Sequence, residues 1–215
     1  MTSNTITLYQ SASSPNSRRV RIFLAEKGLT IPVIQVDLGK GEQHSDAYRV
    51  INPRRVVPTL VLDDGTAIGE VPAIIRYIEE TYPQPPLLGT TAKEKALVAM
   101  WDRRAELDGF AAVMEAIRNA APGLKGRAIA GPYDYDQIPQ LAERGKQRVK
   151  NFFIDLNARL GEAQYVAGEH YSVADITAIA TVDFAVKALN FAIPEDHKSL
   201  QRWYDAVSKR PSASA

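Results

Sequence analysis

The chain has 215 residues, 45% of them hydrophobic and 24% charged, which is ordinary globular composition with room for one large or two small domains. Its net charge of +1 gives no overall field that would attract nucleic acid or an anionic membrane, so neither is an expected partner. Cysteine is absent, which excludes disulfides, cysteine-based zinc sites and any mechanism that uses a thiol of the protein itself. There is no apolar run of about 18 residues and no basic-then-apolar leader, so we expect a cytoplasmic protein. The three histidines are scattered along the chain, and we expect no metal site.

The first 40 residues predict a strand, a helix and a second strand. Residues 6–9 are a short apolar strand, and a polar loop leads into a helix that ends at Gly28, a residue suited to the left-handed position after a helix. Residues 32–38 are predicted as the second strand. A strand–helix–strand unit of about 35 residues favours parallel pairing of its two strands.

A β-hairpin and a third helix come next, after a polar stretch with a short helical patch. Residues 55–62 are β-branched and apolar, with Pro58 near the predicted strand's start, where a proline does not interrupt the ladder. Asp64-Gly65 between two apolar runs is a strong hairpin signal. Pro72 suits the first turn of a helix, and isoleucines at helical spacing give that helix a buried face.

Beyond a proline-rich connector the pattern is helical almost throughout. We predict a long helix over 92–120, a second over 137–160, a third from Ser172 and a last one stopped by Pro211. Ser172 followed by Asp175 is close to a capping box and is interpreted as structural. The chain is predicted to divide into an α/β domain over 1–81, a linker over 82–91 and an all-helical domain over 92–215.

Several motifs, in this order and spacing, resemble the glutathione transferase family, in particular its serine-type, bacterial-like members. The resemblance covers nearly the whole chain. The motifs that carry it are Ser14-Pro15-Asn16-Ser17, Asn52-Pro53, Val57-Pro58-Thr59-Leu60, Glu70, the proline linker, Trp101, Tyr165-Val166-Ala167-Gly168, Tyr171-Ser172-Val173-Ala174-Asp175 and Arg210-Pro211.

The resemblance implies a thioredoxin-like N-terminal domain followed by an all-α helical bundle, in a homodimer. It implies an enzyme that takes glutathione as co-substrate and presents its thiolate to a small hydrophobic electrophile, without a metal. There are two alternatives. One is a glutathione-dependent isomerase or dehalogenase, and the other is a non-catalytic member of the fold that binds a ligand or a protein.

Ser14 lines up with the catalytic serine of that family. A hydroxyl at a helix N-terminus favours a nearby thiolate, because its hydrogen bond and the helix dipole both stabilise negative charge. Since the loop holds four serines in seven residues, Ser13, Ser11 and Tyr9 stay open as alternatives.

The resemblance also implies the residues that bind glutathione. Val57, next to a proline that is cis in the family, would offer its backbone to the cysteinyl part, and Glu70 would bind the γ-glutamyl ammonium. Val71 stands where most members have a serine, so only its N–H is left for the γ-glutamyl carboxylate, and Val56 replaces a common polar residue. The implied glutathione-binding set is Val57, Pro58, Glu70, Val71, Gln43 and His44.

The second substrate is expected between the two domains. The predicted members of this second-substrate pocket come from the first polar loop and the first long helix. They are Ser11, Ala12, Arg104, Asp108 and Ala111.

Overall fold

The computed structural model describes residues 6–215 and divides them into two compact units. The N-terminal unit runs to Pro85 and includes Ala130–Asp134 and the final residue. The helical unit comprises Pro86–Ile129 and Tyr135–Ser214.

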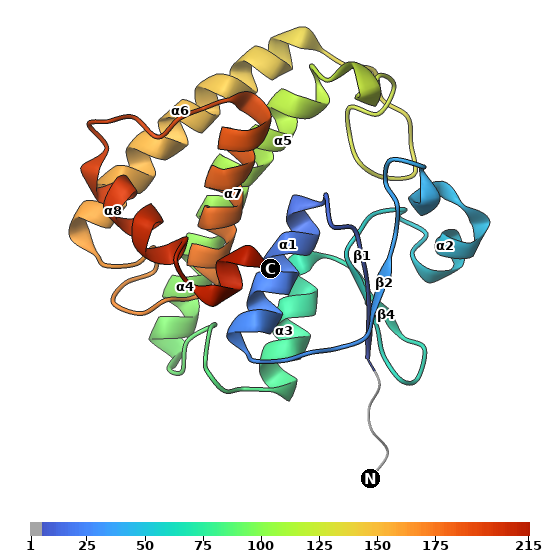
Figure 1. The fold of residues 1–215 in the computed structure, drawn as a ribbon, viewed down its shortest axis with the longest axis horizontal. Coiled ribbons are helices and arrows are strands. Elements are labelled where there is room, and N and C mark those ends of the chain that lie inside the picture. Colours follow the sequence, from blue (N-terminus) through green and yellow to red (C-terminus); the bar gives the residue numbers. More distant parts are fainter. Residues whose placement is uncertain (1–5) are drawn as a thin grey trace. The chain divides into compact units, whose positions relative to one another are not determined.

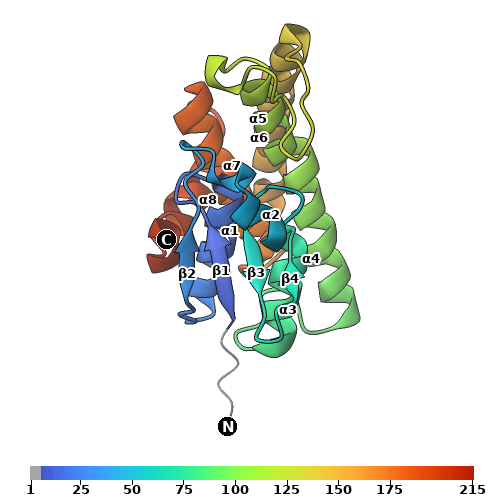
Figure 2. The same ribbon diagram turned by 90° about the vertical axis from the view of Figure 1, so that its right-hand side faces the viewer.

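The N-terminal unit is built on a four-stranded sheet with the order β2-β1-β3-β4. β1 pairs with β2 in parallel, as predicted, whereas the β1–β3 and β3–β4 pairs are antiparallel. Figure 2 shows the strands side by side. Their bounds are β1, Thr7–Gln10; β2, Val33–Gln35; β3, Thr59–Val61; and β4, Ala67–Ile68.

Helices cover both faces of this sheet. The helices α1 and α3 lie together on one face, and α2 lies on the other (Figure 1). Three isoleucines of α3, at positions 74, 75 and 78, are buried as their spacing predicts. The bounds are α1, Pro15–Glu26; η1, a 3₁₀ turn, Glu42–His44; α2, Asp46–Ile51; and α3, Val71–Thr81.

Two predicted strands are shorter in the structure. The second strand keeps only Val33–Gln35 of the predicted 32–38 and is half exposed, because it forms an edge of the sheet. The third begins at Thr59 rather than at residue 55, since the chain first passes through Arg55 at a φ of 54° and a cis Val57–Pro58 peptide bond. The proline therefore stands just before the ladder.

The second unit is all-helical, as predicted, with the helices packed on one another (Figure 1). The bounds are α4, Ala92–Arg104; η2, a π-helical segment, Ala105–Phe110; α5, Ala111–Arg118; η3, Pro122–Leu124; α6, Pro139–Glu162; α7, Val173–Leu189; α8, Lys198–Val207; and η4, Pro211–Ser214.

The prediction of one regular helix over 92–120 is wrong in its middle, where the π-helical segment η2 separates α4 from α5. A π turn inserts into an α-helix without a clear sequence signal and shifts the side chains after it around the helix. Three apolar side chains of this stretch are more than one-third exposed: Leu97, Met100 and Leu107. The apolar spacing therefore predicts the helix but not which of its side chains are buried.

The helices α5 and α6 approach each other at Gly145. A Cβ atom on Gly145 would lie 2.7 Å from the backbone nitrogen of Ala116 and 2.9 Å from the carbonyl oxygen of Ala112. Both of these atoms belong to the backbone of α5, so they cannot move aside unless the whole helix moves. The two helices can pack this closely only because α6 has no side chain at this position.

Within residues 6–215, no helix is long and apolar enough to cross a membrane. Over the same residues, no group of three or more His, Asp or Glu side chains is arranged to hold a metal ion.

Candidate functional site

The sheet register brings three predicted site segments to one end of the N-terminal unit. Tyr9 is paired with Thr59, and Leu60 is paired with Ile68. Ser11 follows the end of β1, Val57 and Pro58 precede the start of β3, and Glu70 follows the end of β4, so all lie beyond the paired residues at the same end of the sheet. The helices α1 and α3 both begin at this end, because each comes directly after the end of its strand.

Two helix N-termini at one place favour an anionic ligand, since each presents unpaired N–H groups and a partial positive charge. Neither α1 nor α3 has an acidic residue in its first turn. The start of α1 therefore has no carboxylate of its own, whereas α3 has the Glu70 carboxylate at its N-cap.

Ser14 is the N-cap of α1 and is 7% exposed. Its Oγ accepts a hydrogen bond of 3.2 Å from the backbone N–H of Ser17. A hydroxyl has one proton to donate besides its acceptor lone pairs, so Ser14 can cap the helix and still donate to a ligand atom.

The other serines of the loop are engaged in holding its shape. The Ser17 Oγ accepts from the backbone N–H of Ser11 at 3.3 Å, and the Ser11 and Ser13 hydroxyls are 3.2 Å apart. Tyr9 lies within β1 and packs against Tyr48, with ring centroids 6.2 Å apart. Of the four candidates for the thiolate donor, Ser14 is the one that stands at the helix N-terminus.

Val57 has the backbone groups that an extended ligand requires. Its side chain is buried in an apolar cluster with Val36 and Tyr48. Neither its N–H nor its C=O takes part in a hydrogen bond within the described residues 6–215. The Val57–Pro58 bond is cis, as the resemblance implies.

A small polar network holds the chain before Pro58. The Tyr48 hydroxyl donates to the Val56 carbonyl at 2.7 Å, and the Asn52 side-chain amide donates to the same carbonyl at 3.0 Å. Asn52 also donates to the Thr59 hydroxyl at 2.8 Å. Asn52 and Thr59 are motif residues of the family resemblance, but no local signal in the sequence indicates that Tyr48 joins them.

Glu70 is the N-cap of α3 and adopts a φ of 64°, a left-handed conformation that glycine usually occupies. Its side chain is exposed and makes no hydrogen bond or ion pair within residues 6–215. Strained residues of this kind gather at functional sites, where the surrounding fold holds them in place. Val71 is buried and begins α3, so its N–H is one of the unpaired donors of the helix.

Gln43 and His44 lie in the 3₁₀ turn η1, which begins seven residues after the end of β2. Gln43 is 9% exposed, and its Oε1 is buried without a hydrogen-bond partner in the part of the chain that is described. The Nε of Arg55 is likewise buried without a hydrogen-bond partner among the described residues. Buried polar atoms are nearly always paired, so these two atoms are exceptions within the described residues.

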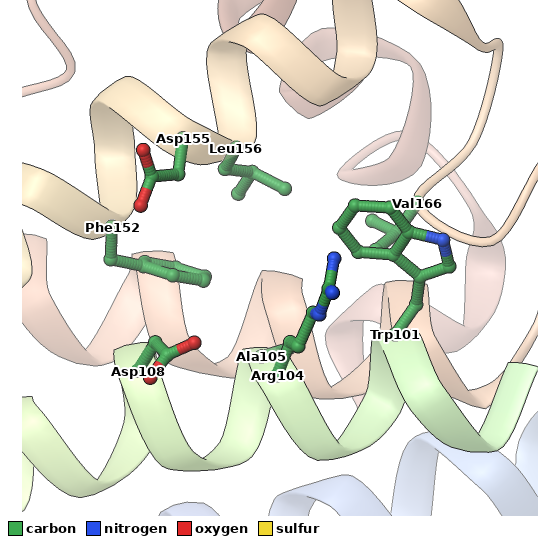
Figure 3. A pocket seen from close by; sticks show the side chains of 8 residues that line it. All are labelled: Trp101, Arg104, Ala105, Asp108, Phe152, Asp155, Leu156 and Val166. Carbon is green, nitrogen blue, oxygen red and sulfur yellow. The ribbon is translucent and has the colours of Figure 1, made fainter.

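Two of the five residues predicted for the second substrate line a cavity of about 250 Å³ within the helical unit. Arg104 and Asp108 lie on one wall of this cavity (Figure 3). Ala111 is not among its lining residues, and Ser11 and Ala12 belong to the N-terminal unit. Six further lining residues were not predicted for this pocket from the sequence; they are Trp101, Ala105, Phe152, Asp155, Leu156 and Val166.

Two family models match the chain. The model of the glutathione S-transferase N-terminal domain matches residues 8–86, and that of the C-terminal domain matches residues 139–206. Glutathione S-transferase 2 of Saccharomyces cerevisiae is 35% identical over 208 residues, covering 95% of this chain and 86% of the relative. A maleylacetoacetate isomerase of Pseudomonas aeruginosa is 42% identical over 99 residues, covering 43% of this chain and 47% of the relative.

Solved structures agree with this result over nearly the full length. Gtt2 of Saccharomyces cerevisiae superposes with a TM-score of 0.88 at 33% identity, covering 97% of this chain and 98% of the other. A glutathione S-transferase domain-containing protein of Marinobacter aquaeolei gives a TM-score of 0.87 at 37% identity, covering 96% and 98%. With both domain models matched and the whole fold shared, this chain is an enzyme of the glutathione S-transferase family.

Proposed function

We propose that the enzyme binds glutathione at the end of the sheet where α1 and α3 begin, and that Ser14 stabilises its thiolate. The observation that carries this proposal is the strand register, which brings Ser11, Val57 and Glu70 to that end together with both helix N-termini. The thiolate then attacks a small hydrophobic electrophile.

The chemistry requires a change in the pKa of the glutathione thiol. A free thiol has a pKa of about 8.5, so only a few per cent is ionised at neutral pH. Lowering this pKa by about two units takes roughly 2.7 kcal/mol of preferential thiolate stabilisation. A hydrogen bond from the Ser14 hydroxyl and the positive end of the α1 dipole both contribute in that direction.

The remaining groups bind the rest of the tripeptide. The Val57 N–H and C=O pair with the cysteinyl residue in the manner of a strand, and the Glu70 carboxylate binds the γ-glutamyl ammonium. The Val71 N–H meets the γ-glutamyl carboxylate, while Gln43 and His44 contact the glycyl end.

Glutathione binding can be tested by calorimetry on the wild type and on Glu70→Gln. We expect the substitution to weaken binding at least tenfold, because a charge-assisted hydrogen bond becomes a neutral one. Glu80→Gln is the control, since it makes the same change at the other end of α3, where Glu80 pairs with Arg76 on the surface. Equal affinity of Glu70→Gln and wild type would remove Glu70 from the site.

The other parts of the proposal rest on family membership. Ser11, Ala12, Arg104, Asp108 and Ala111 contribute to the second-substrate pocket, and the enzyme is a cytoplasmic homodimer that uses no metal. Functionally, the chain divides into the glutathione-binding domain 1–81, the linker 82–91 and the helical domain 92–215.

A second candidate function is glutathione-dependent isomerisation. It is favoured by the relatives named maleylacetoacetate isomerase, which are 40–42% identical over 95–99 residues of this chain. The two reactions differ in stoichiometry, because a transferase uses one glutathione per product whereas an isomerase regenerates it. Maleylacetoacetate consumed with no loss of free thiol would favour the isomerase, and conjugation of a panel of electrophiles with equal loss of thiol would favour the transferase.

A further inference from the structure

Arg21 lies in the second turn of α1 and is half-buried. Its guanidinium donates hydrogen bonds to three successive residues where β1 ends and the loop to α1 begins. Nη1 donates to the Oε1 of Gln10 and, at 3.3 Å, to the Ser11 carbonyl, while Nη2 donates to the Ala12 carbonyl at 3.4 Å. One side chain of α1 therefore holds the start of the loop that carries Ser14.

The backbone of Ser11 is held by two side chains of α1. Its N–H donates to the Ser17 Oγ at 3.3 Å, and its carbonyl accepts from Arg21. Ser17 is fully buried, and it precedes Arg21 by four residues, so the two side chains lie on the same face of the helix. Both polar groups of the Ser11 backbone are thus bonded to one face of α1.

These contacts reach Ser14 through the turn that Ser11 begins. The Ser11 carbonyl that accepts from Arg21 also accepts from the Ser14 N–H, at 3.1 Å. At its other end, the Ser14 Oγ accepts from the Ser17 N–H at 3.2 Å. A displacement of Ser11 would therefore move the acceptor of the Ser14 N–H and turn the Ser14 hydroxyl away from its present direction.

The surroundings of Arg21 disfavour its charge. Burial lowers the pKa of the guanidinium, and the positive charge of Arg18 lowers it further. Within residues 6–215, Arg21 forms no ion pair with a carboxylate, and its hydrogen bonds go to an amide oxygen and two backbone carbonyls. The feature of arginine that this place uses is its planar fork of donors, which bonds several acceptors at once in a way that a lysine ammonium does not.

We propose that Arg21, assisted by Ser17, is a positioning residue: it holds the Ser11 backbone so that the Ser14 hydroxyl is directed at the glutathione sulfur. The inference rests on the proposed function of Ser14 and adds the side chains that keep this serine in place. Arg21 acts through the hydrogen bonds that it donates and not through its charge. Such a role matters because a misplacement of about 1 Å in a reacting group can cost about 10²-fold in rate.

The test is the pKa of the bound glutathione thiol, followed by thiolate absorbance in the intact protein. Arg21→Met and Arg21→Lys should each raise this pKa by at least about half a unit, because lysine keeps the charge but lacks the fork of donors. Both substitutions are repeated in a Ser14→Ala background. There they should cause no further change, since two residues that act through one hydrogen bond are not additive.

Arg202→Met is the matched control. Arg202, in α8, also donates to two backbone carbonyls, those of Leu160 at 2.7 Å and Ala163 at 3.3 Å, but within the helical unit. Its loss should leave the thiol pKa unchanged, and circular dichroism of each variant checks that it is folded. Ser17→Ala should raise the thiol pKa as Arg21→Met does, because the Ser11 N–H then lacks its acceptor.

Three results would overturn the inference while the proposed function stands, each with Ser14→Ala raising the thiol pKa. The first is a wild-type pKa in Arg21→Met. The second is a wild-type pKa in Arg21→Lys together with a raised one in Arg21→Met, which would assign the effect to charge. The third is an equal rise from Arg21→Met with and without Ser14. An unchanged pKa in Ser14→Ala itself would instead refute the proposed role of Ser14, and the inference with it.

Discussion

Ser14 and Ser172 each cap a helix in this enzyme, and they differ in the residue that stands three positions later. Ser172 caps α7 in the helical unit, and the third residue of that helix is Asp175, whose carboxylate accepts from the Ser172 N–H at 3.0 Å. Ser14 caps α1 in the N-terminal unit, and the corresponding residue is Ser17, which carries no charge. One helix N-terminus is neutralised by its own acid, and the other is not.

We propose that this difference separates a structural cap, at α7, from a ligand site, at α1. Asp175 is fully buried and also accepts from the Val166 N–H at 2.9 Å and from the Trp203 indole N–H at 2.8 Å. Its polar groups are paired inside the unit and leave nothing for a ligand. At α1 no acid takes the corresponding place, and we propose that the sulfur of glutathione, an anion when it reacts, lies at this helix N-terminus.

The largest expected effect is that of Asp175→Ala on stability. The substitution leaves buried N–H groups of Val166, Ser172 and Trp203 without an acceptor, at about 1–3 kcal/mol each. We expect the free energy of unfolding in urea to fall by at least about 3 kcal/mol. Asp205→Ala, at an exposed position on α8, is the control and should change it by less than about 0.5 kcal/mol. A loss as small as the control's would mean that Asp175 is not the centre of this network.

The same carboxyl gives a pH dependence of similar size. Burial raises the pKa of Asp175 to about 6 from an ordinary value of 3.8, against the opposing effect of its hydrogen bonds. A raised acid pKa contributes stability that is fully present below pH 3.8 and is lost as the pH rises through 6. We expect the free energy of unfolding to fall by about 2 kcal/mol between pH 4 and pH 6 from this group.

Urea titrations of the wild type and of Asp175→Asn at several pH values check this expectation. The Asn variant should lack the fall, because its amide does not titrate. Glu94 acts in the opposite direction and equally in both proteins: hydrogen bonds from the Thr90 hydroxyl, the Thr90 N–H and the Thr91 N–H lower its pKa from 4.5 to about 2, so its contribution is lost as the pH falls below 4.5. If the free energy of unfolding changed with pH in the same way in the wild type and in Asp175→Asn, the raised pKa of Asp175 would be contradicted.

A smaller effect is expected at the contact between α5 and α6. Gly145→Ala forces a methyl group against backbone atoms of Ala112 and Ala116, and overpacking of this kind costs about 1–3 kcal/mol. Gly161→Ala, in the same helix, has only the Ser199 hydroxyl nearby at 3.6 Å and should be neutral or stabilising. Thermal unfolding of both variants decides whether the space at Gly145 is needed.

The smallest effect is expected from adding a charge to the first turn of α1. Asn16→Asp is close to isosteric and adds one negative charge there. We expect it to raise the pKa of the bound glutathione thiol by about half a unit, because the added carboxylate repels the thiolate. Asn151→Asp makes the same change on the exposed surface of α6 and should leave that pKa unaltered. An unchanged pKa in both variants would indicate that the α1 terminus does not face the sulfur.

Much of the fold could be predicted from the sequence, because local chemistry specifies it. Pro15 and Pro72 lie in the first turns of α1 and α3, and the Asp64-Gly65 turn joins β3 to β4. The π segment Ala105–Phe110 could not be predicted, since a single π turn within a helix has no clear sequence signal. The short extent of the edge strand β2 was also missed, because its length depends on which strands lie beside it.

The site was predicted in a different way. The single residues Ser14, Val57 and Glu70 came from the family resemblance, which sets no distance between them. Their common end of the sheet is apparent only from the register of β1, β3 and β4. The left-handed backbone at Glu70 was likewise not predictable, because glycine is the residue that usually signals such a conformation.

The central claim is that Ser14 at the uncharged start of α1 ionises glutathione, and the pKa of the bound thiol tests it most directly. Thiolate absorbance should be titrated against pH with saturating glutathione on the wild type and on Ser14→Ala. We predict a wild-type pKa about two units below the free value of about 8.5, and a value in Ser14→Ala that returns most of the way to it. An equally lowered pKa in both proteins would contradict the claim and assign the thiolate to another donor.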